Sequence, residues 1–597
     1  MVGAGKAVRS LKTPEFLPEA KPQRSMLADV IVVCLLGGLL VAILTVGREW
    51  HAPYREETQI DLSIAKLPLY TLYSLARGWV AMGFSFVFAI LYATWAYYDA
   101  RARTVLLPVL DILQSIPVLG FMPGLVLALV AVFPTSNFGL ELACVLMIFT
   151  AQVWNMVFSY YDSLKAIPAE LRQMGALCGF SPLKRFLNIE LPFAAQGLIY
   201  NCMVSMAGGW FFLTINEAFT LGNKNFQLPG LGSYMSVAIA QGDVTAQIAA
   251  VVAMGVMIIS VDRLIWWPLV IWSRKFKLED TASGPMETTL VQRMLARSHI
   301  LSTAAEMPVH LGKRLLDFLP RPATPKAKLE NPARAAEISE PHARAMRIGS
   351  RVFYGGLMAA ILAIGGYGLY VLAGILAEID LREWTYILSA TLATFLRVLA
   401  ALVISSLWTI PVGVWIGLNP RVSRFLQPVI QFAASFPAPM LYPLVLGAIL
   451  AIGGSLQWGA VVLMMLGAQW YILFNVAAGA QAIPADMVAC ADVFKINGLS
   501  RWRDFILPAI FPSLVTGWIT SAGGAWNASI VAEYVQQGSH TYTAFGLGEL
   551  ISQATNKGNF DVLAGGVVVM ALTVVLINRT FWKRMQRVGD TYCRFGG

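Results

Sequence analysis

The chain has 597 residues, of which 57% are hydrophobic and only 13% are charged, with a mean hydropathy of +0.63. Soluble globular proteins carry about 25% charged residues, so this composition excludes a soluble enzyme, a disordered chain, a collagen and a disulfide scaffold. A polytopic membrane protein remains. The net charge of +10 acquires a meaning only when its location is known.

Each run of roughly 20 apolar residues can cross the hydrocarbon core of a bilayer as a helix. The sequence predicts about twelve such helices, six in each half. They cover approximately residues 26–46, 69–98, 105–133, 138–160, 193–216, 244–272, 353–375, 384–418, 424–452, 457–478, 509–530 and 561–583. Prolines interrupt the third run of each half and predict a bend or a division there.

Lysine and arginine predict the orientation of the chain, because cytoplasmic segments are enriched in both. With the N-terminus inside and the spans alternating, inner segments hold 35 of the 44 basic residues and outer segments hold six. We therefore expect both termini in the cytoplasm. The positive charge is then a topology signal, and a nucleic-acid partner is not expected.

The two halves repeat one another. An offset of 320 residues relates Pro108, Pro117 and Pro123 to Pro428, Pro437 and Pro443, and an offset of 316 relates Trp266 to Trp582. Because each half has an even number of spans, the repeats face the same way across the membrane. The predicted fold is an all-α polytopic membrane protein with two parallel six-helix repeats in pseudo-two-fold symmetry.

Four segments follow from this division. They are a cytoplasmic N-terminal tail (1–25), permease repeat 1 (26–273), a cytoplasmic linker (274–351) and permease repeat 2 (352–597). The linker is polar and rich in proline, with a weakly amphipathic stretch near 290–318. We interpret it as a tether that rests partly on the membrane surface, with a regulatory role as the alternative.

The longest inner loop of each half, between the fourth and fifth spans, follows one pattern. Each copy begins with Ile-Pro, carries an acid two residues later, passes a glycine and a basic or aromatic cluster, and ends with Leu-Pro. Proline suits the first turn of a helix and glycine permits a sharp reversal, so the pattern predicts a short helix, a turn and another helix start. The alternative is an ordinary basic cytoplasmic loop. The copies are AIPAELRQMGALCGFSPLKRFLNIELP (Ala166 to Pro192) and AIPADMVACADVFKINGLSRWRDFILP (Ala482 to Pro508).

This loop resembles the EAA loop of permease subunits in ATP-binding-cassette (ABC) importers. More narrowly, the chain resembles the nitrate/sulfonate/taurine/bicarbonate permease family of type I importers. The resemblance also rests on LQSIPVLGFMP (Leu113 to Pro123), on GGWFFLTINEAF followed by PGLG, and on GAWNASIVAEYV followed by FGLG. It covers roughly residues 69–272 and 384–583, and so both repeats.

The resemblance implies that each loop is a coupling helix that docks into a cleft of an ATPase subunit and transmits its closure. The family's Glu-Ala-Ala falls here on Gln173-Met174-Gly175 and on Ala489-Cys490-Ala491, and its glycine on Gly179 and, three residues late, on Gly498. The family's acid is missing from both copies, and Glu170 and Asp486 are its expected substitutes. The expected coupling residues are Glu170, Gln173, Gly175, Gly179, Ser181, Lys184, Arg185, Asp486, Ala489, Ala491, Gly498, Ser500, Arg501 and Arg503.

The resemblance further implies a transporter of several chains. Two cytoplasmic ABC ATPase subunits would bind ATP and Mg²⁺, and a periplasmic solute-binding protein would deliver a small anionic solute for import by alternating access. The location would be the bacterial inner membrane. This chain lacks G-x-x-x-x-G-K-[ST], HExxH and a nucleophile elbow, and its six cysteines form no CxxC. We therefore expect no catalysis, no cofactor, no metal and no disulfide in it.

Arg77 and Arg397 lie inside spans at matching positions. An intramembrane arginine is costly and suggests a functional role, and two guanidinium groups would offer an anion bidentate hydrogen bonds. The alternative is a structural arginine tied to a carboxylate or to backbone carbonyls.

Other candidates for the translocation pathway also occur as matched pairs: Ser115 with Ser435, Glu217 with Glu533, and Trp210 with Trp526. The glutamates would meet a binding protein or gate the pore, or else have a solvated or helix-packing role. The tryptophans also suit packing or interface anchoring.

Two other classes of protein compete with the importer permease. An ion- or proton-coupled secondary transporter also has twelve spans in two halves, but it needs membrane carboxylates and the spans hold few acids. A non-transporting membrane scaffold or enzyme subunit would have no reason to keep matched loops on both halves.

Overall fold

The computed structural model describes residues 26–592 with several gaps, which are 54–57, 116–117, 223, 277–355, 357–358, 360–361, 364 and 539. The predicted tail 1–25 lies outside the described residues. So does the predicted linker, apart from one helical turn, Arg274–Phe276. The described residues are predominantly helical, in agreement with the predicted all-α class.

The backbone packs as two units. The first takes the described residues that fall within 1–45, 158–201 and 261–377, and the second takes those within 46–157, 202–260 and 378–597. The second unit therefore contains residues of both predicted repeats. The boundaries of the four predicted segments stay a prediction.

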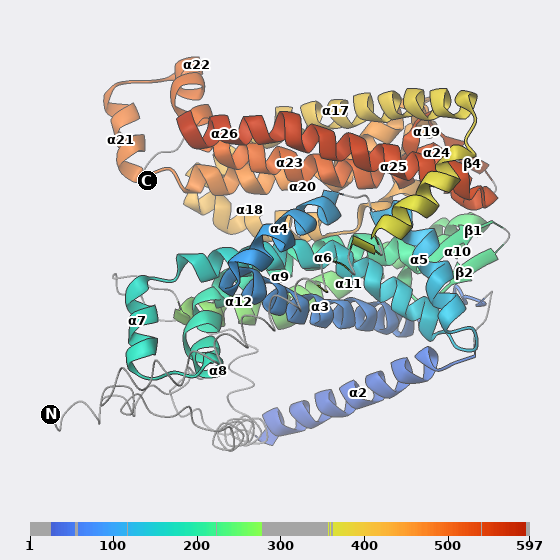
Figure 1. Cartoon of the computed structure of the whole chain (residues 1–597), viewed down its shortest axis with the longest axis horizontal. Helices are drawn as coiled ribbons and strands as arrows, with labels where there is room; N and C mark the ends of the chain where they lie inside the picture. Colours follow the sequence, from blue (N-terminus) through green and yellow to red (C-terminus); the bar gives the residue numbers. More distant parts are fainter. Residues whose placement is uncertain are drawn as a thin grey trace. The chain divides into compact units, whose positions relative to one another are not determined.

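The first repeat contains long helices joined by shorter ones (Figure 1). The long helices are α2 (Met26–Trp50), α3 (Leu67–Tyr98), α6 (Phe138–Ala166), α9 (Leu191–Asn216) and α11 (Val244–Val261). The shorter ones are α4 (Ala100–Ser115), α5 (Val118–Val132), α7 (Ala169–Leu177), α8 (Pro182–Arg185), α10 (Leu231–Gln241) and α12 (Trp267–Ser273).

The second repeat follows the same order of elements. Its long helices are α17 (Leu381–Leu418), α20 (Leu456–Gln481), α23 (Leu507–Ala532) and α25 (Phe560–Ile577). The shorter ones are α18 (Pro420–Ser435), α19 (Tyr442–Ala451), α21 (Ala485–Val493), α22 (Gly498–Ser500), α24 (Leu547–Lys557) and α26 (Lys583–Tyr592).

Small residues bring α17, α20 and α23 close together, as is usual for helices in a membrane. These helices lie side by side in Figure 1. A Cβ atom at Gly413 of α17 would lie 2.8 Å from Val476 Cγ1 of α20, and one at Gly479 of α20 would lie 2.7 Å from Ser513 Cβ of α23. A side chain at either glycine would therefore push the helices apart.

Eight helical segments in the described residues are long and apolar enough to cross a membrane, and each coincides with one predicted span. A ninth, Pro420–Ser435 with Ala438–Ala451, is bent by 82° at its prolines. The predicted run 105–133 is divided into α4 and α5, so the expected interruption is confirmed in both halves. The run 26–46 lies in α2, whereas the run 353–375 is only partly described.

Two β-hairpins were not predicted, and neither were the short helices that follow them, α10 and α24. β1 (Ala218–Leu221) pairs antiparallel with β2 (Lys224–Gln227) between α9 and α10, and β3 (Tyr534–Gln537) pairs with β4 (His540–Thr543) between α23 and α24. In the second unit the hairpin tips reach across to the other repeat. The Gly222 amide donates to Thr555 O at 3.1 Å, and the Gly538 amide donates to Ile239 O at 2.9 Å. The two donors are 316 residues apart in the sequence, and so are the two acceptors, so the two hydrogen bonds are counterparts of each other.

The predicted reversal in the long inner loop is present in both copies. After α7, the amides of Gly179 and Phe180 donate to Ala176 O and Gly175 O, and Gly179 has φ +64°. After α21, the same bonds run from Lys495 to Asp492 and from Ile496 to Ala491.

The structural counterpart of Gly179 is therefore Lys495, 316 residues later, with φ +52°. The assignment of Gly498 to this position was wrong. Gly498 also has a positive φ, but it begins α22. The prediction failed because it assumed that this turn needs a glycine. In the structure, the hydrogen bonds of the turn hold a lysine in the left-handed conformation instead.

We expect Gly179→Ala to destabilise its loop by about 1 kcal/mol, because a side chain disfavours positive φ. Lys495→Gly should leave the second loop at least as stable as before. Amide hydrogen exchange over 169–190 and 485–506 measures both effects. Faster exchange over 485–506 in Lys495→Gly would show that the lysine side chain, and not its backbone conformation, maintains the turn.

Candidate solute pathway and coupling surfaces

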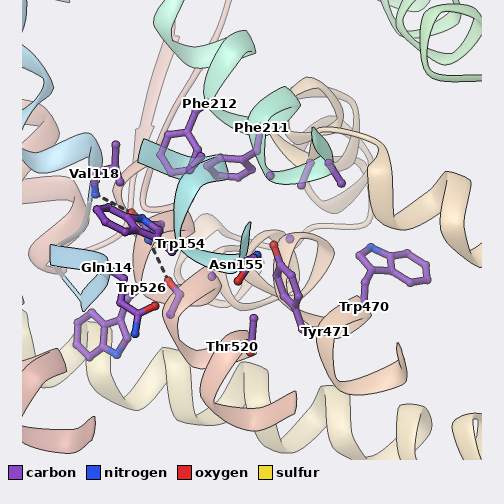
Figure 2. Close-up of a pocket in the computed structure, with 18 of the residues that line it drawn as sticks. Gln114, Val118, Trp154, Asn155, Phe211, Phe212, Trp470, Tyr471, Thr520 and Trp526 are labelled. Atoms are coloured by element: carbon purple, nitrogen blue, oxygen red, sulfur yellow. Dashed lines mark hydrogen bonds between the residues drawn. The ribbon is translucent and has the colours of Figure 1, made fainter. Parts of the chain in front are cut away.

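A cavity of about 270 Å³ lies in the second unit, with walls from both repeats (Figure 2). Many of its lining residues are counterparts of each other under the two sequence offsets. The matched pairs are Gln114 and Ala434, Val118 and Ala438, Thr150 and Leu466, Ala151 and Gly467, Trp154 and Trp470, Asn155 and Tyr471, Ala207 and Gly523, Gly208 and Gly524, and Phe211 and Asn527. The cavity therefore lies where the two repeats present equivalent surfaces.

The cavity wall combines apolar and polar side chains and is uncharged. No charged side chain occurs among the described residues that line it. Asn527 closes one part of the wall, where its Oδ1 accepts a hydrogen bond from the Val118 amide at 3.0 Å, drawn dashed in Figure 2. The side chains of Trp154, Asn155 and Tyr471 also line the cavity, and their polar groups are not used in hydrogen bonds to the described protein. These groups are available to a small solute.

Arg77 does not line this cavity. Its side chain is fully buried in the second unit, where Nε and Nη2 donate to both carboxylate oxygens of Glu141 at 2.6 and 2.7 Å. Nη1 donates to Glu217 Oε1 at 2.7 Å and to Pro229 O at 2.8 Å. One arginine thus connects α3, α6 and the segment between α9 and α10. This agrees with the alternative prediction of a structural arginine tied to a carboxylate or to backbone carbonyls.

The Glu217 carboxylate also positions the turn before α10. Glu217 also accepts from Ser74 Oγ and from the Gly232 amide, both at 2.7 Å. A Cβ atom at Gly230 would overlap with the Glu217 carboxylate. Glycine is required there for space, since its backbone is extended.

The second repeat contains a matched but weaker cluster. Arg397 Nη1 donates to Glu533 Oε1 at 2.7 Å and to Phe545 O at 2.8 Å, and Thr394 takes the place of Ser74. Arg397 Nη2 donates to Gln457 Oε1 at 2.6 Å, where the first repeat has Glu141. The cluster therefore has one carboxylate instead of two, and the Arg397 side chain is 12% exposed.

Glu217 and Glu533 are fully buried. A solvated position and a direct contact with a binding protein, two of the predicted roles, are inconsistent with this burial, whereas a helix-packing role agrees with it.

The remaining pathway candidates lie in different places, and only one of those described lines the cavity. Trp526 lines the cavity, whereas Trp210 packs against α3, where a Cβ at Gly78 would lie 2.6 Å from Trp210 Cζ3. Ser435 is buried at the end of α18. Ser115 ends α4, and its side chain lies outside the described residues.

Sequence reasoning missed the partners of both arginines and most of the cavity wall. Glu141 and Gln457 are matched under the 316-residue offset, as are Trp154 and Trp470. A residue-by-residue comparison of the repeats would have singled out these positions, but not the contacts that they make.

The two inner loops present matched apolar side chains. Leu177 of α7 is 88% exposed and its counterpart Val493 of α21 is 77% exposed, while Leu183 and its counterpart Leu499 are 44% and 84% exposed. Each loop then continues through a π-helical turn, Phe186–Glu190 or Arg501–Ile506. Leucine and valine side chains this exposed, on loops predicted to lie outside the bilayer, are suited to contact with another protein.

The predicted coupling residues occupy both faces of these loops. Gly175 and Ala491 are buried, and a Cβ at Gly175 would lie 2.7 Å from Ile189 Cδ1 of the π-helical turn that follows. Arg185 pairs with Glu190 at 2.9 Å, whereas its counterpart Arg501 pairs with Asp492 at 2.6 Å. Ser181 caps α8 by accepting from the Lys184 amide. The exposed members are Glu170, Gln173, Gly179, Lys184, Asp486, Ala489, Gly498, Ser500 and Arg503.

We expect Arg77→Met to destabilise the protein by about 3–5 kcal/mol, because it leaves two buried carboxylates without their partner. Arg397→Met should cost less, since only one carboxylate loses its partner and the Arg397 side chain is already partly exposed. The apparent Tm in detergent measures both effects. Glu141→Gln, which gives the first cluster the chemistry of the second, is the matched control with a smaller loss. Equal Tm values for Arg77→Met and wild type would contradict the ion-pair assignment.

Comparison with known proteins identifies the chain's relatives. The family model for the binding-protein-dependent transport system inner membrane component matches twice, over residues 85–267 and 409–581. The chain is 27% identical over 186 residues to a nitrate import permease protein of Leptolyngbya laminosa, covering 31% of this chain and 63% of that protein. It is 28% identical over 189 residues to a bicarbonate transport system permease protein of Synechococcus elongatus, covering 32% and 65%.

A taurine transport system permease protein of Escherichia coli is 24% identical over 209 residues, which cover 35% of this chain and 71% of that protein. The matched stretches thus span somewhat under two thirds of the nitrate and bicarbonate permeases and about a third of this chain. The two family matches fall one in each predicted repeat, and together they cover more than half of the sequence. The chain belongs to the family of binding-protein-dependent transport system inner membrane components, as a multi-pass membrane protein with two fused permease domains.

Proposed function

We propose that this chain is the membrane-spanning permease of an ATP-driven importer. It would take a small anionic solute from a periplasmic binding protein and release it in the cytoplasm. Its two repeats would act as the two permease subunits of other family members. The observation that carries the proposal is the cavity whose walls are matched residues of both repeats.

Energy would enter through the two inner loops. Two ABC ATPase subunits would bind ATP and Mg²⁺ and contact the loops at the exposed apolar pair of each, Leu177 with Leu183 and Val493 with Leu499. The proposed orientation, with both termini in the cytoplasm, rests on the distribution of basic residues and gives both loops access to such subunits.

The solute would pass through the central cavity. The Asn155 amide, the Tyr471 hydroxyl and the Trp154 indole N–H would provide neutral hydrogen bonds to it. Neutral groups suit a permease, because a transported solute must bind strongly enough to enter and weakly enough to leave.

The hairpin tips would form the outer gate. Among the described residues, each tip donates a backbone hydrogen bond to the other repeat, from Gly222 to Thr555 and from Gly538 to Ile239. A single hydrogen bond contributes about 0.5–1.5 kcal/mol, and ATP binding at the loops would separate the tips and expose the cavity to the outside.

A proton-coupled secondary transporter is the weaker alternative. Proton relays use carboxylates or histidines along the pathway, and neither occurs among the described residues that line the cavity. Transport without any ATPase partner would favour this alternative.

We expect Asn155→Ala and Tyr471→Phe to reduce solute uptake by about tenfold, since each removes a hydrogen bond of about 1–1.5 kcal/mol to the solute. Uptake by vesicles that contain the assembled transporter, with nitrate, bicarbonate and taurine as the solutes tried, is the measurement. Tyr200→Phe, which changes an exposed tyrosine on α9, is the matched control. Undiminished uptake in both cavity variants would contradict the proposed pathway.

We expect Leu177→Asp with Leu183→Asp to weaken binding of one ATPase subunit, and Val493→Asp with Leu499→Asp to weaken binding of the other. A carboxylate at an apolar contact must be desolvated without a partner. Co-purification of the ATPase with the full chain measures this. The conservative changes Leu177→Met and Val493→Ile should preserve binding, and retention of the ATPase in the fourfold aspartate variant would contradict the coupling assignment.

A further inference from the structure

A second cavity in the second unit, the lateral cleft, has an apolar wall. It has a volume of about 430 Å³ and lies between α11 on one side and α18 with α20 on the other. Val251, Val252 and Gly255 form the α11 side, and Phe432, Phe436 and Trp470 form much of the other. The indole N–H of Trp470 donates to Leu466 O within its own helix at 2.9 Å. The described wall therefore offers a ligand contact surface but almost no hydrogen bonds.

The cleft reaches the lipid-facing surface. Along α11, Val244, Ile248, Val252 and Val256 are 51–59% exposed and lie on one face, four residues apart. This helix belongs to a segment, Val244–Phe276, that is long and apolar enough to cross a membrane. The exposed face therefore contacts hydrocarbon. Because Val252 belongs both to this face and to the cleft wall, the cleft is continuous with the lipid surface.

We propose that the lateral cleft binds one acyl chain of a bilayer lipid. Apolar cavities do not hold water well and accept apolar ligands, and the solvent next to Val252 in a membrane is hydrocarbon. A charged headgroup finds no partner among the described lining residues, so the chain enters the cleft and the headgroup stays outside.

The two repeats differ at this site. Under the 316-residue offset, Val251 corresponds to Val567 and Gly255 to Ala571. Val567 packs directly on α5, where a Cβ at Gly120 would lie 2.8 Å from Val567 Cγ2. Protein thus fills the space next to Val567, whereas Val251 faces the open cleft. The surroundings of Val251 and Val567 therefore differ, and two identical permease subunits would not produce this difference.

The bound chain would contact the wall of the solute cavity. Phe436, Leu466 and Trp470 line both the lateral cleft and the central cavity. An acyl chain in the cleft would contact side chains that the solute also meets. Lipid occupancy therefore adjusts the shape of the proposed solute pathway, although binding of the lipid does not itself depend on the transport role.

Photolabelling tests this site in the full chain reconstituted in lipid nanodiscs. The probe is a phosphatidylglycerol with a diazirine in the middle of one acyl chain, and labelled residues are located by mass spectrometry. We expect label on Phe432, Phe436 or Trp470, which are at least partly buried, in addition to label on the exposed face of α11.

Gly255→Leu fills the cleft and should reduce the label on these three residues at least fivefold. A Cβ at Gly255 would meet Phe432 Cζ at 3.6 Å, an ordinary contact, so the helices need not move to accept it. Gly83→Leu is the matched control, because Gly83 is an exposed glycine on α3 with nothing within 4 Å of its Cβ position. Phe432→Ala enlarges the cleft and should increase label on Trp470.

Three results would overturn the proposal. The first is label confined to the exposed face of α11 in the wild type. The second is equal label on the cleft residues in Gly255→Leu and Gly83→Leu. The third is loss of cleft label when taurine is added at saturating concentration, which would assign the cleft to the solute. Because the readout is labelling, a failed transport assay leaves the lipid result interpretable.

Discussion

In each repeat, the region around the hairpin depends on one arginine and on the carboxylate that follows α9 or α23. Removing a guanidinium and a carboxylate from water costs several kcal/mol for each ion, so the pair is tolerated only where further hydrogen bonds complete it. Arg77 meets this condition with two glutamates and a backbone carbonyl, and Glu217 with a serine and an amide. These contacts determine where α10 begins and how the hairpin before it is oriented.

The two repeats keep their backbone geometry while their side chains differ. The turn that ends α7 recurs after α21 with a lysine in place of the glycine. The arginine cluster recurs with Gln457 in place of Glu141. Fusion makes such divergence possible, because each position of a fused chain occurs once in the assembly, whereas a residue of a homodimer occurs on both sides of the axis. The central cavity shows the same divergence, because Asn155 of the first repeat corresponds to Tyr471 of the second.

Hydropathy and the internal repeat predicted the long helices, the interruption in the third run of each half and the paired inner loops, because each depends on residues close together in the sequence. The four-residue strands were missed, since stretches as short as Ala218–Leu221 have no distinctive periodicity. The ion pairs of Arg77 were missed because Glu141 and Glu217 are 64 and 140 residues away in the sequence. The cavity wall comes from both repeats, and only the packing of the two brings it together.

The buried clusters also explain why the central cavity has no charge. An unpaired arginine near the pathway would attract an anion strongly, and release on the other side would then be slow. In both repeats the guanidinium is neutralised by a carboxylate at 2.7 Å and its hydrogen bonds are directed to the protein. The positive charge of the spans therefore maintains the structure, and the solute would meet neutral donors such as Asn155 and Tyr471. On the proposed transport role, selectivity would then belong mainly to the protein that delivers the solute, and the permease would supply a weakly binding passage whose opening is controlled by the inner loops.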